Sequence, residues 1–292
     1  MTASPGKDAV RDAVDATKEE SVLSETARAL KRGAQKSVDA EYPLRTVNCT
    51  IRFGGLVAVN ELDMTVRRGE IYGLIGPNGA GKTTIFNLLT GVYRPSSGEI
   101  YFEGQRIDGL RSYEISRRGV SRTFQNIRLF PSMSVLENVM TACHRHACQN
   151  LFDAVVRSPR FVRDERDHRH FAVELLEIFD LARFKDEGGT SLPYGNQRRL
   201  EIVRALATRP TLLLLDEPAA GMNPSEQEDL MRLIQQIRDR FKLTILLVEH
   251  NMKVVMGVCE RIQVVDYGKS IALGIPDEIR NDPKVIEAYL GD

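Results

Sequence analysis

A glycine-rich run in the first third of the chain has the spacing of a phosphate-binding loop. It consists of Gly76, Pro77, Asn78, Gly79, Ala80, Gly81, Lys82, Thr83 and Thr84, which fits the pattern G-x-x-x-x-G-K-[ST]. Such glycines let backbone N–H groups turn toward phosphate oxygens at the start of a helix. Lys82 would reach the outer phosphates, and the Thr83 hydroxyl would ligate Mg²⁺. We therefore expect residues 76–84 to bind a nucleotide.

Two acidic residues follow a run of four leucines that has the length of a buried strand. The run is 212–215, and Asp216 and Glu217 come directly after it. Open α/β sheets bind ligands beyond the carboxyl ends of their strands, so both carboxylates should lie near the phosphate loop. Asp216 is placed to hold Mg²⁺, and Glu217 is placed to polarise the water that attacks a terminal phosphate.

A histidine follows the next apolar run along the chain. His250 comes shortly after residues 243–248, so it should reach the same edge of the sheet. There it would contact the terminal phosphate or steady the attacking water. A histidine after a strand is also commonly a surface or helix-capping imidazole, but the complete phosphate loop and the Asp216-Glu217 pair favour the catalytic interpretation.

A second group of residues contains potential zinc ligands. Cys143, His144, His146 and Cys148 lie within six residues. On a helix Cys143 and His146 would face one way, whereas His144 and Cys148 would face another. Structural zinc usually takes paired ligands from two separated segments. We therefore interpret this cluster as an exposed helix end without a metal.

The elements that must position these residues alternate along most of the chain. Buried strands between helices indicate a largely parallel sheet that is covered on both faces. We expect strands at 46–53, 57–66, 70–75, 98–103, 119–123, 212–215, 243–248, 261–265 and 270–273. We expect helices at 82–89, 135–147, 171–179, 196–208 and 251–258, one after Pro224, and two short ones within 276–290. The helical signals between 130 and 191, around a polar stretch at 157–170, predict a separate helical subdomain.

The N-terminal segment and the composition limit the possible partners and cellular location of the protein. Residues 1–43 are polar and predict a flexible extension, although apolar residues between 22 and 30 leave a short docking helix as an alternative. Forty basic and forty acidic side chains cancel, which gives no support to a nucleic-acid partner. No apolar run is long enough to span a membrane, and no signal core is present. The four cysteines form no C-x-x-C pair, which fits reduced thiols in the cytosol.

The order of the motifs resembles that of the ATP-binding cassette (ABC) family. After the phosphate loop come Gln125, the segment 192–197, the Asp216-Glu217 pair and His250. The similarity covers residues 44–292. It implies a P-loop NTPase cassette, an α/β fold with a RecA-like parallel-sheet core, an antiparallel β subdomain and a helical subdomain over about residues 130–195.

The resemblance assigns roles to single residues. Phe53 would stack on adenine, and Gln125 would sense both Mg²⁺ and a membrane partner. Gly195 would belong to a signature segment that closes on the ATP held by a second cassette. The metal ligands would be Thr83, Gln125 and Asp216, and the catalytic residues would be Lys82, Gln125, Glu217 and His250. ATP and Mg²⁺ would be the cofactors.

Five stretches are similar to the LivG-type subunits of bacterial branched-chain amino acid importers. They are 52–56, 122–130, 194–202, 216–224 and 285–291. This similarity implies an ATPase that energises uptake from the cytoplasmic face of the inner membrane, where it is peripheral. Its partners would be two hydrophobic permease subunits, a second cassette, either identical or different, and, indirectly, an external solute-binding protein.

The stretch after Gln125 is apolar where a loop is expected. It contains Ile127, Leu129, Phe130, Met133 and Val135. An exposed apolar patch usually marks a partner surface, so we expect a groove here that receives a short cytoplasmic helix of a permease subunit. The alternative is that these residues anchor the helical subdomain.

Two segments depart from the family pattern. The signature usually reads L-S-G-G-Q, whereas this chain has Pro193, Tyr194 and Asn196 in place of Ser, Gly and Gln. The serine hydroxyl that would contact the opposite phosphate is lost, so we expect weaker closure and not inactivity, because proline is tolerated in a first helical turn. Asn223 stands where the family generally has Asp, in the loop that follows the Asp216-Glu217 pair. In the family this loop contacts the other cassette, and the replacement puts that contact in doubt.

Two other functions of ABC proteins fit the sequence less well than the importer. A soluble ABC protein acting on DNA or ribosomes typically has two cassettes or a long coiled coil, and this chain shows neither. An exporter ATPase that extracts outer-membrane lipopolysaccharide is the nearer alternative. The signature with Tyr194 and the segment 130–191 favour the importer.

Overall fold

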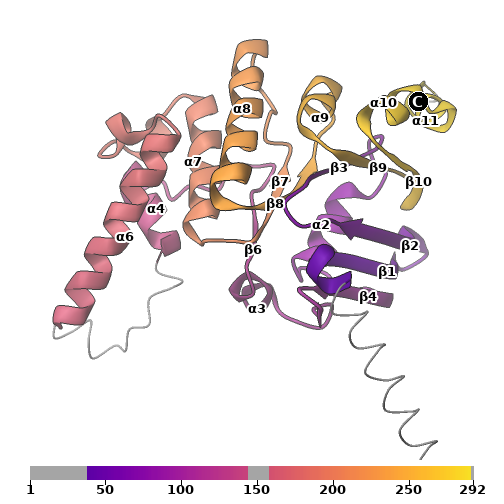
Figure 1. Ribbon diagram of the computed structural model, residues 1–292, viewed down its shortest axis with the longest axis horizontal. Helices are drawn as coiled ribbons and strands as arrows, with labels where there is room; N and C mark the ends of the chain where they lie inside the picture. The colour runs from indigo at the N-terminus through magenta and orange to yellow at the C-terminus, as the bar shows by residue number, and fades with distance from the viewer. Residues whose placement is uncertain (1–37, 144–157, 291–292) are drawn as a thin grey trace, which may run out of the picture.

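The computed structural model describes residues 38–143 and 158–290, which form two sheets with helices packed around them (Figure 1). The larger sheet has the strand order β10-β9-β3-β8-β7-β6. Its strands are β3 (Ile71–Ile75), β6 (Val120–Arg122), β7 (Leu212–Asp216), β8 (Thr244–Val248), β9 (Arg261–Asp266) and β10 (Lys269–Gly274). Neighbours are parallel except β9 and β10. The predicted largely parallel sheet is therefore confirmed.

The second sheet is antiparallel and has the order β2-β1-β4-β5. Its strands are β1 (Leu44–Phe53), β2 (Leu56–Val66), β4 (Ser97–Phe102) and β5 (Gln105–Arg106). One face of it packs on helix α2 (Lys82–Leu89) and on Tyr72 and Leu74 of β3, in one shared apolar core. Figure 1 shows this sheet beside α2, the helix that directly follows the phosphate loop.

Among the described residues, three helices belong to the subdomain that lies on the other side of the large sheet (Figure 1). They are α4 (Val135–Cys143), α6 (Pro159–Ile178) and α7 (Tyr194–Ala207), with short turns η2 (Ala182–Phe184) and η3 (Gly189–Ser191) between α6 and α7. The polar stretch at 159–170 is helical, because Ser158 caps α6 by accepting the Phe161 N–H at 3.2 Å. Helix α7 begins two residues before the predicted start at 196.

The zinc-like cluster lies mostly outside the described residues. Cys143, its one described member, is buried in the core of the helical subdomain. The expected exposed helix end is therefore wrong for Cys143, because α6 covers this end of α4. Burial raises the pKa of the thiol to about 11, so it remains a neutral packing group.

The other described helices lie around the large sheet and continue to residue 290. They are α3 (Ser112–Arg117), α8 (Pro224–Phe241), α9 (Met252–Val258), α10 (Pro276–Asn281) and α11 (Pro283–Leu290). Helices α10 and α11 are the two short C-terminal helices expected from the sequence, and they lie beside β10 (Figure 1). No helix within the described residues is long and apolar enough to cross a membrane.

The predicted N-terminal extension, 1–43, falls largely outside the described residues. Its last part, 38–43, contacts the antiparallel sheet: Asp39 pairs with Arg45 at 2.8 Å, and Arg68 Nε donates to the Ala40 carbonyl at 3.0 Å. The role of the preceding residues stays a prediction.

Candidate nucleotide site

The phosphate loop connects the end of β3 to the start of α2. Gly81 precedes the helix with φ 99°, and a Cβ on it would lie 2.5 Å from the Ala58 carbonyl oxygen. A Cβ on Gly76 would lie 2.0 Å from the Val265 carbonyl oxygen. The loop can therefore take this path only with glycine at both positions. It leaves Thr83 exposed at the first turn of α2, where its hydroxyl is accessible.

Lys82 is buried and lies across the phosphate loop. Its Nζ donates to the carbonyls of Gly76 and Pro77, both at 2.7 Å. Burial lowers the pKa of Lys82, and the charges of Glu217 and Asp216 counter that shift. The side chain thus brings a positive charge to the centre of the loop, as the sequence predicts.

A cavity of about 410 Å³ opens beside the loop and joins segments from across the chain. Its lining residues are Gly76, Pro77, Asn78, Gln125, Glu217, His250 and Tyr289. Gln125, Glu217 and His250 were predicted from separate motifs, and the fold brings them together. Tyr289 was not predicted.

Glu217 is the polar centre of this cavity. Its Oε2 accepts a hydrogen bond from Gln125 Nε2 at 2.9 Å and lies 3.6 Å from Nδ1 of His250. The residue has φ 48°, which is uncommon for a residue with a side chain, and its N–H donates to the Val248 carbonyl at 2.8 Å. A strained, well-anchored backbone of this kind is typical of functional sites. Here it aims the carboxylate into the cavity.

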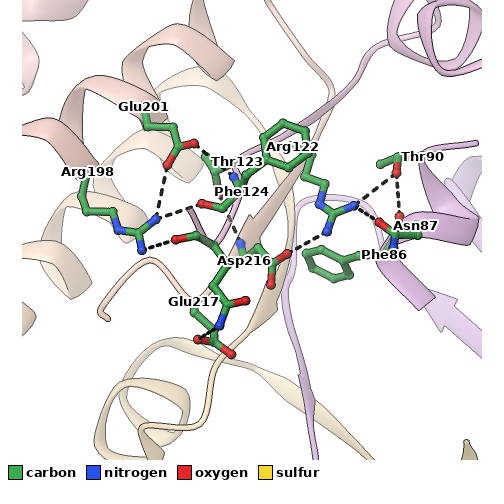
Figure 2. Close-up of polar contacts among 11 residues, drawn as sticks. Phe86, Asn87, Thr90, Arg122, Thr123, Phe124, Arg198, Glu201, Asp216 and Glu217 are labelled. Carbon is green, nitrogen blue, oxygen red and sulfur yellow. Dashed lines mark hydrogen bonds and ion pairs between the residues drawn. The ribbon is translucent and has the colours of Figure 1, made fainter. Parts of the chain in front are cut away.

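Asp216, at the carboxyl end of β7, is held by an arginine that the sequence analysis did not assign. Arg122 Nη2 donates to Asp216 Oδ2 at 2.8 Å, and both side chains are less than a tenth exposed (Figure 2). Arg122 also donates to Asn87 Oδ1 at 2.7 Å, and its guanidinium lies over the rings of Phe86 and Phe124. Asp216 is therefore a fixed carboxylate with a paired charge.

The available donors fit Mg²⁺ better than a softer metal. Within 38–143 and 158–290, no group of three or more His, Cys, Asp or Glu side chains could hold a metal ion. The predicted ligands, Thr83, Gln125 and Asp216, offer oxygen atoms only. Mg²⁺ commonly uses one or two carboxylates together with substrate phosphates, and this set matches that pattern.

A second buried ion pair fastens the loop before Gln125 to helix α7. Arg198 Nη1 donates to the Phe124 carbonyl at 2.9 Å, and its Nη2 donates to the Gln125 carbonyl (Figure 2). The same Nη2 also donates to Tyr194 Oη at 2.9 Å. Glu201 accepts the Phe124 N–H at 3.2 Å and lies 3.4 Å from Arg198. We call Arg198 and Glu201 the α7 clamp. It holds the backbone of Gln125, the residue whose side chain donates to Glu217.

Known proteins are similar to this chain in sequence. A family model described as ABC transporter matches residues 59–220. The chain belongs to the ABC transporter family. A second model, described as branched-chain amino acid ATP-binding cassette transporter, matches residues 269–292. The protein is thus a P-loop ATPase cassette, as the order of its motifs predicted.

Three relatives show how far the similarity extends. The branched-chain amino acid transport ATP-binding protein BraF of Pseudomonas aeruginosa is 47% identical over 249 residues, which are 85% of this chain and 98% of BraF. LivG of Salmonella typhimurium is 48% identical over 86% of this chain and 98% of its own length. The lipopolysaccharide export protein LptB of Haemophilus influenzae is 37% identical over 80% of this chain and 91% of its own.

The fold also matches a solved cassette. The ADP conformation of an ATP-binding cassette of an ABC transporter superposes with a TM-score of 0.75 and 30% identity, over 86% of this chain and 99% of that one. The predicted cassette fold, with its parallel core, antiparallel subdomain and helical subdomain, is confirmed.

Two predicted residues of the cassette lie away from the cavity. Phe53, at the end of β1, is 44% exposed and packs edge-on against Tyr93, with ring centroids 5.2 Å apart. It offers an open aromatic face, so adenine stacking stays a prediction. Gly195 lies in the first turn of α7 and does not line the cavity. Its assignment to the ATP of a second cassette likewise stays a prediction.

The departures from the family signature have local structural reasons. Pro193 is the residue just before α7, and no side chain caps that helix end. The ring of Tyr194 lies against Gly221, and a Cβ added to Gly221 would lie 2.9 Å from a carbon of that ring. Asn223 caps α8: its Oδ1 accepts the Glu226 N–H at 3.0 Å. Asn and Asp cap helices about equally well, so this replacement preserves the start of α8.

Sequence analysis missed several residues of the site: Arg122, Arg198, Glu201, Glu249 and Tyr289. Glu249 is fully buried and accepts the Ala219 N–H at 2.7 Å, which fixes the segment after Glu217. Burial raises its pKa. Arg122 lies three residues before Gln125, and Glu249 directly precedes His250. A charged residue close to a predicted motif was therefore the signal that could have identified them. Tyr289 lies in 285–291, one of the five stretches similar to LivG-type subunits, but that similarity assigned it no role.

Proposed function

We propose that this cassette is the ATP-hydrolysing subunit of a branched-chain amino acid importer. The observation that carries the proposal is the second family match, at 269–292, together with relatives named for branched-chain amino acid transport that cover 98% of their own lengths. LptB, the exporter relative, is less similar, at 37% identity. The exporter alternative is therefore less well supported.

The chemistry we propose follows from the cavity. The phosphate loop and Lys82 bind the phosphates of ATP. Thr83, Gln125 and Asp216 would hold Mg²⁺, which would screen the charge of those phosphates. Glu217 accepts a proton from the attacking water, because its carboxylate is fixed in the cavity between Gln125 and His250. His250 Nδ1 lies 3.6 Å from that carboxylate, so its ring can orient the same water or contact the terminal phosphate.

Gln125 links this chemistry to the rest of the transporter. Its side chain contacts Glu217, whereas its backbone is held by the α7 clamp. A shift of α7 would therefore move the amide that touches the general base. We propose that Gly195, on the same helix, closes on the ATP of a second cassette.

A groove beside this loop is the proposed docking site for a permease helix. It has a volume of about 610 Å³, and its walls include Phe124, Arg128, Phe130 and Arg204. Phe130 is 42% exposed, with the Arg204 guanidinium 4.8 Å from its ring centre. The expected apolar patch is only partly present, because Leu129 and Val135 are buried in the core and anchor the helical subdomain.

In the assembled transporter, we propose, the cassette lies on the cytoplasmic face of the inner membrane, beneath two hydrophobic permease subunits. A second cassette, identical or different, completes the ATPase, and an external binding protein delivers the solute. Deleting the chromosomal copy should abolish uptake of labelled leucine, isoleucine and valine. Wild-type protein should restore it, and the Glu217→Gln variant should not. Unchanged uptake in the deletion strain would refute the solute assignment.

Crosslinking in native membranes tests the docking site. Phe130→Cys should form adducts with a permease chain, whereas Tyr267→Cys, at a turn and 81% exposed, should form none. Cys148 is changed to Ser in both, while Cys49, Cys143 and Cys259 are buried and unreactive. Absence of any adduct from Phe130→Cys, with normal uptake, would refute docking at this groove.

A further inference from the structure

The last described helix reaches the nucleotide cavity from the far end of the chain. Helix α11 starts after Asp282, whose side chain accepts the Lys284 N–H at 2.8 Å, and it packs against α10 and β10. Val285 is buried and anchors it. This packing brings Tyr289 to the wall of the cavity that also contains Gln125, Glu217 and His250.

The Tyr289 hydroxyl is buried but has no well-formed hydrogen bond. Its ring packs on the main core. Burial raises the pKa of the phenol, and the backbone N–H of Gly76 partly opposes that rise. The group is therefore a neutral O–H donor at neutral pH. Buried polar groups almost always have a partner, so a donor without an acceptor at the wall of a binding cavity points to a ligand.

The neighbours of Tyr289 define that ligand. Gly76, Pro77 and Asn78 form the start of the phosphate loop, and Glu217 and His250 face the position proposed for the attacking water. Loops of this kind bind phosphate oxygens through their backbone N–H groups, so the acceptor that fits this position is a phosphate oxygen. The terminal phosphate of ATP fits this description, whereas ADP lacks that group.

We propose that Tyr289 positions the terminal phosphate of ATP by donating a hydrogen bond from its hydroxyl. The inference rests on the nucleotide site proposed above and extends it to the C-terminal segment, 269–292, which the second family model matches. Tyr289 would thus let the cassette distinguish ATP from ADP.

Removing only the hydroxyl tests this role. Tyr289→Phe keeps the ring and its packing, and calorimetry with Mg²⁺ compares the affinities for ADP and for a non-hydrolysable ATP analogue. A hydrogen bond to a charged group is stronger than a neutral one, so we expect about a tenfold loss of affinity for the analogue and none for ADP. Tyr267→Phe is the matched control, because that side chain is 81% exposed, and both affinities should stay unchanged.

A spectroscopic measurement gives an independent test. The chain contains no tryptophan, so Tyr289→Trp introduces a single indole at the cavity wall. Its emission should change when the ATP analogue binds and should stay constant when ADP binds. Equal responses to the two nucleotides would overturn the proposal.

The outcomes separate this inference from the site on which it rests. If Tyr289→Phe weakens ADP and the analogue equally, the residue supports the fold of α11 and not the terminal phosphate. If neither affinity changes, the hydroxyl does not contact the nucleotide. In both cases the inference fails while the site stands. If Lys82→Ala keeps full affinity for both nucleotides, the proposed site itself is wrong.

Discussion

Removing the guanidinium of Arg198 should destabilise the cassette strongly. The side chain is 4% exposed and donates to the carbonyls of Phe124 and Gln125 and to Tyr194 Oη. Arg198→Met would leave these acceptors without their donor, and it would leave the Glu201 carboxylate buried without its counter-charge. Breaking a buried ion pair from one side typically costs about 3 to 5 kcal/mol. That is a large part of a usual unfolding free energy of about 5 to 15 kcal/mol.

The neighbouring arginine supplies the control. Arg199 lies on the same helix, and its pair with Asp229 is long, at 3.7 Å, and partly exposed. Such pairs contribute about 1 kcal/mol or less. Urea denaturation of Arg198→Met and Arg199→Met should therefore separate them by at least about 2 kcal/mol. Adding Glu201→Leu to Arg198→Met should recover part of the loss, because the unpaired carboxylate is then gone.

The pH dependence of the Arg198→Met variant provides a second check. Burial already raises the pKa of Glu201, and loss of Arg198 should raise it further. A carboxyl with a raised pKa in the folded state stabilises the fold while it is protonated, and this stability is lost as pH rises through that pKa. The loss of unfolding free energy in Arg198→Met, relative to the wild type, should therefore be larger at pH 8 than at pH 5. A deficit equal to that of Arg199→Met, or one that shrinks with rising pH, would refute the role assigned to the α7 clamp.

Four further substitutions test the site. Lys82→Ala should abolish ATP binding, whereas Glu217→Gln should bind ATP and fail in single-turnover hydrolysis; normal turnover would remove Glu217 from its role. Pro193→Ser should raise the steady-state ATPase rate of the assembled complex, because serine adds a hydroxyl and a cap at the start of α7; an unchanged rate would mean that neighbouring groups compensate. Arg122→Met should cost about 3 to 5 kcal/mol, and millimolar Mg²⁺ should restore part of the melting temperature by replacing the lost positive charge; no effect of Mg²⁺ would argue against Asp216 as a metal ligand.

Motifs with local chemistry could be predicted from the sequence. The phosphate loop, the Asp216-Glu217 pair and His250 each follow a strand that apolar runs make visible, and parallel strands must end at one edge of a sheet. Pairing of those strands then brings Glu217 and His250 into one cavity. The parallel sheet and the helical subdomain could be predicted for the same reason, because the spacing of apolar residues along the sequence indicates which faces of strands and helices are buried.

Contacts between distant segments could not be predicted in this way. Arg122 and Asp216 are 94 positions apart, and Arg198 and Phe124 are 74 apart. Such pairs depend on how helices and loops dock, which no local pattern encodes. The same limit explains the error in the apolar stretch after Gln125, where hydrophobicity alone did not distinguish Leu129, which is buried, from Phe130, which is exposed.

The pairing of Arg122 with Asp216 has a consequence for how the metal enters. Arg122 and Lys82 carry two positive charges, and Asp216 and Glu217 carry two negative charges, so the four groups together are electrically neutral. Such a pocket offers a free divalent cation little net attraction, and a free triphosphate little repulsion. The charge that balances Mg²⁺ at the proposed site would then come from the nucleotide. We expect the cation and ATP to enter as one complex, with the protein selecting that complex by shape and by oriented dipoles.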